Sequence, residues 1–334
     1  MGDGLTSKIS LSVWILWLVL TFGLSNRGTS VCVRDEAWSK VEVIQTVTAA
    51  SSLALGDSTY MRLAAEITHI VHIAWPMNFK LLLSSFDASL RTRQNLIQLP
   101  SQAYRLNPTK RARFLFISSI STVANYHAVT GESFVPESRV DDLNWSLDLG
   151  YAKAKLVCGK VVERTATNHP EIEIGLVRVG QLVGARSGFW NSDERFVTLT
   201  LSWLPVDIAV EALSEITFSS SPLHLVYHLE NPVRRGWQEV VKLLTKELGI
   251  PRNSIIPLRR WLDLNTSTLN KANPTAGLSD FIEKEFPKML CGKIILDTSF
   301  SRAVSPTMRR VGAVDDDKSL RTYVSYWRRI GILK

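Results

Sequence analysis

Arg113-Phe-Leu-Phe-Ile-Ser118-Ser119 and Gly150-Tyr151-Ala-Lys-Ala-Lys155 are the two stretches of this chain from which its fold can be predicted. The first is an apolar run that ends in two serines, which is typical of a buried strand. The second opens a helical pattern that extends to Asn168. Residues four positions apart in a helix share one face, so Tyr151 and Lys155 are expected to lie side by side. A strand followed by a long helix indicates an α/β unit.

The Tyr151/Lys155 pair and a serine at the end of the preceding strand can form a proton-transfer site. An ammonium beside a phenol lowers the pKa of the phenol from about 10 towards neutrality. The serine can hold a carbonyl oxygen while that oxygen is protonated. We therefore take Ser119, Tyr151 and Lys155 as candidate catalytic residues, with Ser118 as the alternative serine. A Tyr-x-x-x-Lys pair by itself is a weak signal, because it also fits an ordinary exposed helix turn.

Outward from these stretches, short apolar strands alternate with helical patterns. Strands are predicted at Val31–Val33, Val41–Ile44, Ile67–Ala74, Arg113–Ile117 and Glu173–Val179, and helices at Ser58–Ile67, Leu90–Leu99 and Gly150–Asn168. This alternation indicates a parallel sheet flanked by helices. Ligands of such folds bind beyond the carboxyl ends of the strands. Ser119, Gly180 and Gln181 all fall at such strand ends.

The pattern divides the chain into three parts. Residues 1–30 contain an apolar segment, residues 31–235 carry the strand and helix alternation, and residues 236–334 are mostly helical. Within the last part, amphipathic patterns occur at Trp237–Leu248, Ser279–Glu285 and Ser319–Gly331, with prolines between them. We expect an α/β core followed by a smaller, mostly helical C-terminal lobe.

Composition narrows the class of protein. The excess of 39 Lys and Arg over 31 Asp and Glu gives a net charge of +8, but the basic residues are scattered and form no long run. This distribution argues against a nucleic-acid partner. The three cysteines, Cys32, Cys158 and Cys291, lie far apart and lack the spacing of metal ligands. We therefore expect no metal site, no disulfide framework and a reducing compartment.

The apolar segment Ile9–Ser25 has three interpretations: a membrane anchor, a buried strand and helix, or a wrongly specified start of the chain. Its length is at the lower limit for a membrane span. The residues before it are a poor signal-peptide n-region, and no clear small-residue cleavage site follows it. We expect a cytoplasmic protein, with membrane contact through Ile9–Ser25 as the alternative.

Several segments resemble, in the same order, the terminal thioester reductase domains of fungal non-ribosomal peptide synthetase-like enzymes and adenylate-forming reductases. These domains are extended short-chain dehydrogenases/reductases, and the Ser/Tyr/Lys set is that of the superfamily. The further matching segments are His72-Ile-Ala-Trp75-Pro76-Met-Asn78-Phe79, Val177-Arg178-Val-Gly180-Gln181, Gly188-Phe-Trp190-Asn191, Trp203-Leu-Pro205-Val-Asp207, Tyr227-His228-Leu-Glu-Asn231-Pro232, Ser301-Arg-Ala-Val-Ser305-Pro306 and Tyr326-Trp327-Arg-x-x-Gly331. The resemblance covers residues 31–334.

The resemblance implies a Rossmann-like, doubly wound parallel sheet with a smaller helical C-terminal lobe. It implies an NADPH-dependent reductase of secondary metabolism, which converts an acyl thioester on a carrier protein to an aldehyde or an alcohol. Because the chain shows no carrier domain, the carrier would act in trans, or the substrate would be a small carbonyl compound. Ser119 would bind the carbonyl oxygen, Tyr151 would protonate it, and both Tyr151 and Lys155 would also contact the cofactor. Arg34 matches a family arginine that suits the 2′-phosphate of NADPH.

The chain also departs from the family pattern. No Gly-x-x-Gly-x-x-Gly turn, which approaches the cofactor pyrophosphate, is found in this sequence, and the glycines of residues 1–30 lack the needed spacing. We therefore expect the first glycine-rich strand–helix unit to be missing or altered. The alternative to an active reductase is a truncated, inactive remnant or a module that only binds a carrier protein.

Overall fold

The structure, a computed structural model, describes residues 42–186, 200–251, 254–257, 260, 294–313 and 317–331. Its centre is a sheet of four parallel strands in the order β1 (His69–His72), β2 (Arg113–Ser119), β4 (Glu173–Val179) and β8 (Val226–Leu229). Strands β2 and β4 are built from apolar, largely β-branched or aromatic residues, which suit a sheet that is covered on both faces. The predicted parallel α/β fold is confirmed.

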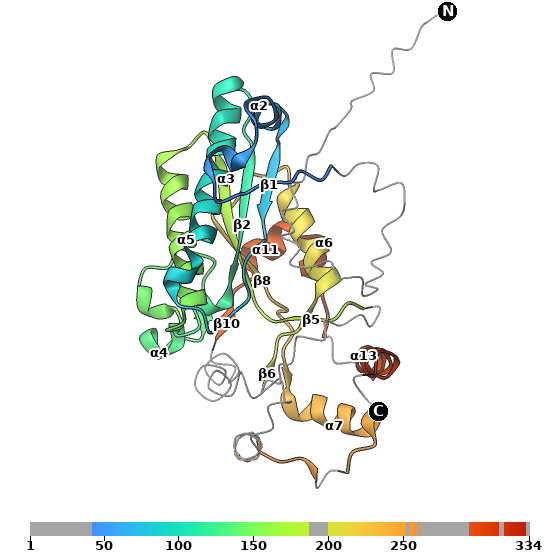
Figure 1. Ribbon diagram of the computed structural model, residues 1–334. Coiled ribbons are helices and arrows are strands. Elements are labelled where there is room, and N and C mark those ends of the chain that lie inside the picture. Colours follow the sequence, from blue (N-terminus) through green and yellow to red (C-terminus); the bar gives the residue numbers. More distant parts are fainter. Residues whose placement is uncertain are drawn as a thin grey trace, which may run out of the picture.

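Longer helices connect and cover these strands (Figure 1). They are α2 (Asp57–Glu66), α3 (Asp87–Leu106), α5 (Gly150–Asn168) and α6 (Val206–Thr217). Two further long helices, α7 (Trp237–Leu248) and α13 (Asp317–Arg329), lie away from the four strands. The shorter helices are η1 (Ser51–Ala54), η2 (Leu83–Phe86), η3 (Ile120–Thr122), α4 (Tyr126–Thr130), η4 (Leu143–Trp145), α11 (Ser299–Val304) and α12 (Pro306–Arg310).

Three short strand pairs lie outside the main sheet. They are the parallel pair of β3 (Phe134–Val135) with β10 (Ile295–Leu296), the parallel pair of β5 (Leu182–Val183) with β7 (Leu204–Pro205), and the antiparallel pair of β6 (Thr200–Leu201) with β9 (Arg235–Gly236). The β3–β10 pair brings the C-terminal part of the chain back to a segment that precedes α5 in sequence.

The two faces of the sheet carry separate hydrophobic cores, because successive strand residues point to opposite sides. Phe114 and Phe116 of β2 pack with α2, α3 and α5 on one face. Leu115, between them, belongs to the core formed with α6 and α12 on the other face. Figure 1 shows α3 and α5 on one side of the strands and α6 on the other. The sheet is therefore the middle layer of three.

Some predicted elements differ from the structure. The strand predicted at Val41–Ile44 is wrong for the described residues, since residues 42–47 adopt no regular structure. The strand predicted at Ile67–Ala74 is confirmed in its centre, as β1. The strand at Val31–Val33 and the helix at Ser279–Glu285 lie outside the described residues, as do residues 1–30. Among described strands, β1 pairs only with β2, so a reversal of strand order, which defines a doubly wound sheet, is not seen in this part of the chain.

The C-terminal part contains the predicted helices α7 and α13, which pack against each other. Helices α11 and α12 instead return to the main body, where α11 contacts β8 and α12 contacts α6. Buried Glu137, which follows β3, accepts hydrogen bonds from the backbone N–H of His228 in β8 and of Ser301 in α11. The division at residue 235 stays a prediction, and residues 294–310 lie beside the core in space.

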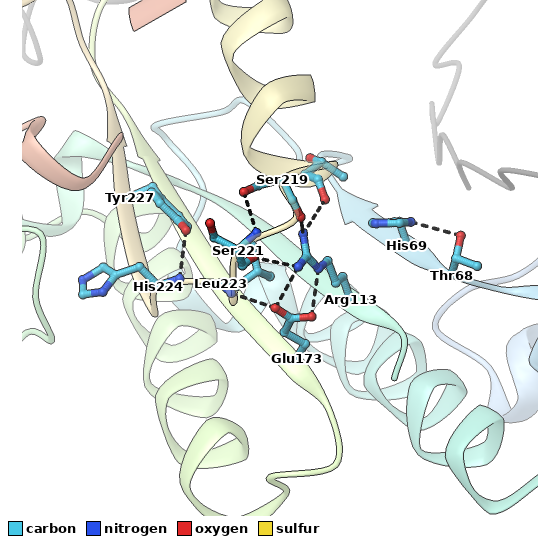
Figure 2. Close-up of polar contacts among 10 residues, drawn as sticks. Thr68, His69, Arg113, Glu173, Ser219, Ser221, Leu223, His224 and Tyr227 are labelled. Atoms are coloured by element: carbon cyan, nitrogen blue, oxygen red, sulfur yellow. Dashed lines mark hydrogen bonds and ion pairs between the residues drawn. The ribbon is translucent and has the colours of Figure 1, made fainter. Parts of the chain in front are cut away.

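An ion pair joins the amino ends of β2 and β4 (Figure 2). Arg113 and Glu173 are register partners, and two parallel hydrogen bonds of 2.8 and 3.0 Å connect the guanidinium to the carboxylate. Arg113 also donates to the carbonyl oxygens of Thr217 and Ser221, and Glu173 accepts from the N–H of Leu223. Bidentate geometry of this kind adds orientation as well as energy. This ion pair lies at the amino end of the sheet, and Ser119 lies at the opposite, carboxyl end of β2.

Among the residues that the structure describes, no helix is both long and apolar enough to cross a membrane. The segment Ile9–Ser25, for which a membrane anchor is one of three interpretations, lies outside those residues.

Candidate active site

The three predicted catalytic residues lie at the carboxyl end of β2 and in the first two turns of α5. Ser119 is the last residue of β2, and its side chain caps the short helix η3 by accepting a hydrogen bond from the N–H of Ser121. Helix α5 begins at Gly150, where a Cβ atom would lie only 2.2 Å from the carbonyl oxygen of Leu81. Glycine therefore allows the loop before η2 to lie directly on the start of α5, beside Tyr151.

Tyr151 is buried between aromatic rings. The ring of Phe79 lies edge-on at 5.1 Å between centroids, and that of Phe86 at 6.4 Å. Burial raises the pKa of Tyr151 to about 12, because a phenolate is poorly solvated there, and a hydrogen bond with Ser119 opposes this rise. The structure thus brings Ser119 and Tyr151 together as the sequence predicts. At neutral pH the phenol keeps its proton and can donate it.

Lys155 is buried and lies on the same face of α5 as Tyr151. Its ammonium donates a 2.5 Å hydrogen bond to the carbonyl oxygen of Ile117 and lies 4.4 Å from the centre of the Trp75 ring. Burial lowers the pKa of Lys155 to about 7. The expectation that Lys155 lowers the pKa of Tyr151 is wrong for this arrangement, because burial dominates and the pKa of the phenol is raised.

The burial of Lys155 makes stability depend on pH. Its pKa is about 7 in the folded chain and near 10.5 in an exposed lysine, so between these values the unfolded chain binds the additional proton. The contribution of Lys155 to the free energy of unfolding is therefore fully present above pH 10.5, and it is lost progressively as the pH falls to the folded pKa of about 7. From pH 7 to pH 9, we expect the free energy of unfolding of the wild type to rise relative to Lys155→Met, with a slope approaching about 1.4 kcal/mol per pH unit. Urea unfolding of both proteins measures this difference, and parallel profiles would contradict the expected burial.

Polar atoms at the neighbouring strand ends are suited to a ligand. Trp75 Nε1, after β1, and Gln181 Oε1, after β4, are buried without a hydrogen-bond partner among the described residues. The bond to Ile117 uses one of the three N–H groups of Lys155. Buried polar atoms without partners are rare in folded proteins. A polar molecule that crosses the carboxyl ends of these strands would satisfy them, and its hydroxyl groups could accept from Lys155. Arg34 lies outside the described residues.

Comparison with known families fits this arrangement. Residues 21–217 match the NAD-binding family model described as "Male sterility protein". The chain belongs to this family. The match includes β1, β2, β4 and α5, the elements that form the polar end of the sheet.

Curated relatives of this member of the NAD-binding family include long fungal enzymes. The chain is 38% identical over 331 residues to an adenylate-forming reductase of Aspergillus terreus, covering 92% of the chain and 31% of that protein. It is 36% identical over 331 residues to the citrinin polyketide synthase of Monascus ruber, and this match covers 93% of the chain and 13% of that synthase. It is 35% identical over 321 residues to 3-methylorcinaldehyde synthase tropA of Talaromyces stipitatus, with 90% and 12% covered. The chain thus spans a third or less of each relative's length.

Solved structures confirm the fold of this family member. The terminal R domain from the myxalamid PKS-NRPS pathway superposes with a TM-score of 0.74 at 19% identity, covering 90% of this chain and 78% of that one. The reductase domain of a non-ribosomal peptide synthetase from Mycobacterium tuberculosis gives 0.58 at 18% identity, with 89% and 78% covered. UDP-glucuronic acid 4-epimerase from Bacillus cereus, in complex with NAD, gives 0.52 at 13%, with 84% and 79% covered. The fold is that of short-chain dehydrogenase/reductase-like reductase domains, as the resemblance implies.

Sequence reasoning missed one residue of the site, Ser121. Its hydroxyl group donates to Ser119 Oγ at 3.0 Å, and its side chain is buried. The available signal was a second hydroxyl residue two positions after a strand-ending serine, a spacing that is typical of a capped turn.

Proposed function

We propose that this chain is an NADPH-dependent reductase that converts a carrier-bound acyl thioester, or a related small carbonyl compound, to an aldehyde or an alcohol. The observation that carries the proposal is the meeting of Ser119, Tyr151 and Lys155 at the carboxyl end of the sheet in a member of an NAD-binding family. The names of two relatives, an adenylate-forming reductase and an aldehyde synthase, support the reaction class.

The proposed chemistry assigns each residue a separate task. A bound nicotinamide cofactor would supply hydride to the thioester carbon. Ser119 donates a hydrogen bond to the carbonyl oxygen, and Tyr151 gives this oxygen its proton as negative charge develops there. The resulting thiohemiacetal releases the carrier thiol and leaves the aldehyde, and a second round of hydride and proton transfer gives the alcohol. Lys155 would help to hold the cofactor, since its ammonium group has N–H groups left to donate to hydroxyl groups of the nucleotide.

The choice of cofactor and the partner are further parts of the proposal. Arg34 follows Val31-Cys-Val33, and a guanidinium suits a phosphate through paired hydrogen bonds, which favours NADPH over NADH. We infer that an acyl thioester would be supplied by a carrier protein. We propose that this carrier acts in trans.

Cofactor binding and product formation test the proposal. Titration of the purified chain with NADPH, followed by cofactor fluorescence, is expected to give saturable binding that is tighter than for NADH. Arg34→Leu should weaken NADPH binding and leave NADH binding unchanged. An acyl-pantetheine thioester should then yield aldehyde with one equivalent of NADPH consumed per two-electron step.

The alternatives give different results. Binding of a carrier protein without binding of NADPH would favour a carrier-binding module. If the chain binds neither the carrier protein nor NADPH, even at millimolar cofactor, the result would favour an inactive remnant. If the chain binds the cofactor but forms no aldehyde from any thioester, the result would favour a carbonyl reductase with a different substrate.

A further inference from the structure

We propose that Ser121 is a positioning residue, which directs the single hydroxyl proton of Ser119 away from η3, towards Tyr151 in the free chain and towards the carbonyl oxygen once substrate is bound. The proposal rests on the reductase function proposed above. It concerns the short helix η3 (Ile120–Thr122), which begins directly after the end of β2.

Ser121 makes two contacts with the same atom. Its backbone N–H donates to Ser119 Oγ at 3.2 Å, and its side-chain hydroxyl donates to that oxygen at 3.0 Å. Ser121 is 4% exposed, so water does not compete freely for its hydroxyl. A capped turn needs only the first of these bonds. The second bond therefore has an effect beyond capping.

The two contacts determine where the proton of Ser119 points. A serine hydroxyl has two acceptor positions and a single O–H donor. Ser121 fills both acceptor positions of Ser119 Oγ, so the O–H group must point to another acceptor. The phenol oxygen of Tyr151 is a neighbouring acceptor, and a hydrogen bond with Ser119 opposes the rise in the pKa of Tyr151 that burial causes.

The direction of these bonds suits the reaction. If Ser119 accepted a bond from Tyr151, the phenol proton would be bound to Ser119 and not available to the substrate. When Ser121 donates to Ser119 and Ser119 donates to the phenol oxygen of Tyr151, the proton of Tyr151 stays free for the carbonyl oxygen. Bonds in such a chain also polarise one another in a buried site. Ser121 thus acts on the reaction only through Ser119.

The same turn offers a matched control. Thr122 Oγ1 donates a 2.8 Å hydrogen bond to the backbone oxygen of Ser119, and Thr122 is also buried. Thr122→Val removes a buried hydroxyl bond from the turn without touching Ser119 Oγ. A purely structural role of Ser121 would therefore give Thr122→Val and Ser121→Ala similar effects.

The first test uses kinetics of the full chain with NADPH and an acyl-pantetheine thioester. Ser121→Ala is expected to lower kcat about 10-fold, the effect of one hydrogen bond, with KM unchanged. Ser121→Thr should restore the rate, and Thr122→Val should leave it unchanged. In a Ser119→Ala background, Ser121→Ala should have no further effect. A full 10-fold loss in that background, or an equal loss in Thr122→Val, would overturn the proposal.

The second test does not depend on activity. The chain labelled with 13Cζ-tyrosine gives a Tyr151 signal, assigned with Tyr151→Phe, that responds to hydrogen bonds at the phenol oxygen. We expect Ser121→Ala to move this signal in the same direction as Ser119→Ala, whereas Thr122→Val leaves it in place. An unmoved signal in Ser121→Ala would refute the proposal even if the chain reduces no thioester. Ser121→Cys, which keeps a weak donor of similar size, replaces Ser121→Ala if the latter does not fold.

Discussion

Replacement of Tyr151 by phenylalanine is expected to lower the rate of reduction by about 10³-fold, within the range known for the loss of a general acid. The ring of Tyr151 lies between Phe79 and Phe86, and a phenylalanine ring fills the same space. The fold and NADPH binding should therefore persist, so that the change appears in kcat and kcat/KM alike. Single-turnover measurement of NADPH oxidation with saturating thioester gives this rate directly.

A second buried tyrosine gives the control for this substitution. Tyr126 follows η3 in the sequence and is 7% exposed. Its ring packs edge-on against that of Trp145, with 4.8 Å between the ring centroids. Tyr126→Phe removes a hydroxyl group from a similar aromatic setting and should leave the rate unchanged. Equal turnover of wild type and Tyr151→Phe would show that another group protonates the carbonyl oxygen, and would remove the basis of the proposed mechanism.

The elements around the site could be predicted because their patterns are long and continuous. Gly150–Asn168 and Glu173–Val179 have the same limits in the sequence pattern and in the structure. Val41–Ile44 shows how a short pattern fails. Its apolar residues alternate with Glu42 as in a half-buried strand, but four residues form a strand only where a neighbouring strand pairs with them, and no such pairing involves residues 42–44 in the described part.

The site itself could be predicted only in part. Helical spacing and the position of a strand end are properties of the sequence, and they placed Ser119 near Tyr151. The direction of the Lys155 ammonium is a property of the packed structure. It depends on a backbone carbonyl oxygen of β2 and on the Trp75 ring, which comes from a loop far away in sequence. The sign of the Tyr151 pKa shift likewise follows from burial, which spacing does not show.

The removal of Glu137 should strongly destabilise the fold. Its carboxylate accepts from the N–H of His228 at 2.9 Å, from the N–H of Phe300 at 2.5 Å, and from both the N–H and the hydroxyl of Ser301. These donors belong to β8 and α11, which are distant from Glu137 in sequence. Glu137 is 3% exposed, so no free water can replace it. Glu137 thus joins the start of α11 to β8, in addition to the β3–β10 strand pair and the packing of α12 on α6.

Glu137→Ala is expected to lower the free energy of unfolding by about 3–5 kcal/mol, because it leaves several buried donors without an acceptor. Glu137→Gln keeps the size and one acceptor oxygen, so its effect should be smaller. Glu132, exposed in the same segment, is the matched control, and Glu132→Ala should change the free energy by less than about 0.5 kcal/mol. Urea unfolding followed by tryptophan fluorescence measures all three variants.

The pH dependence of Glu137 separates its charge from its packing. Burial raises the pKa of this carboxyl group above 4.5, and the hydrogen bonds from Ser301, His228 and Phe300 oppose the rise. Between the unfolded and the folded pKa, the folded chain holds the proton more firmly, so the contribution of this titration is present below pH 4.5 and is lost as the pH rises through the folded value. The stability of the wild type should therefore fall relative to Glu137→Gln across that range, since glutamine does not titrate. If the two profiles run parallel while Glu137→Ala is still strongly destabilised, the donors and not the charge determine the effect.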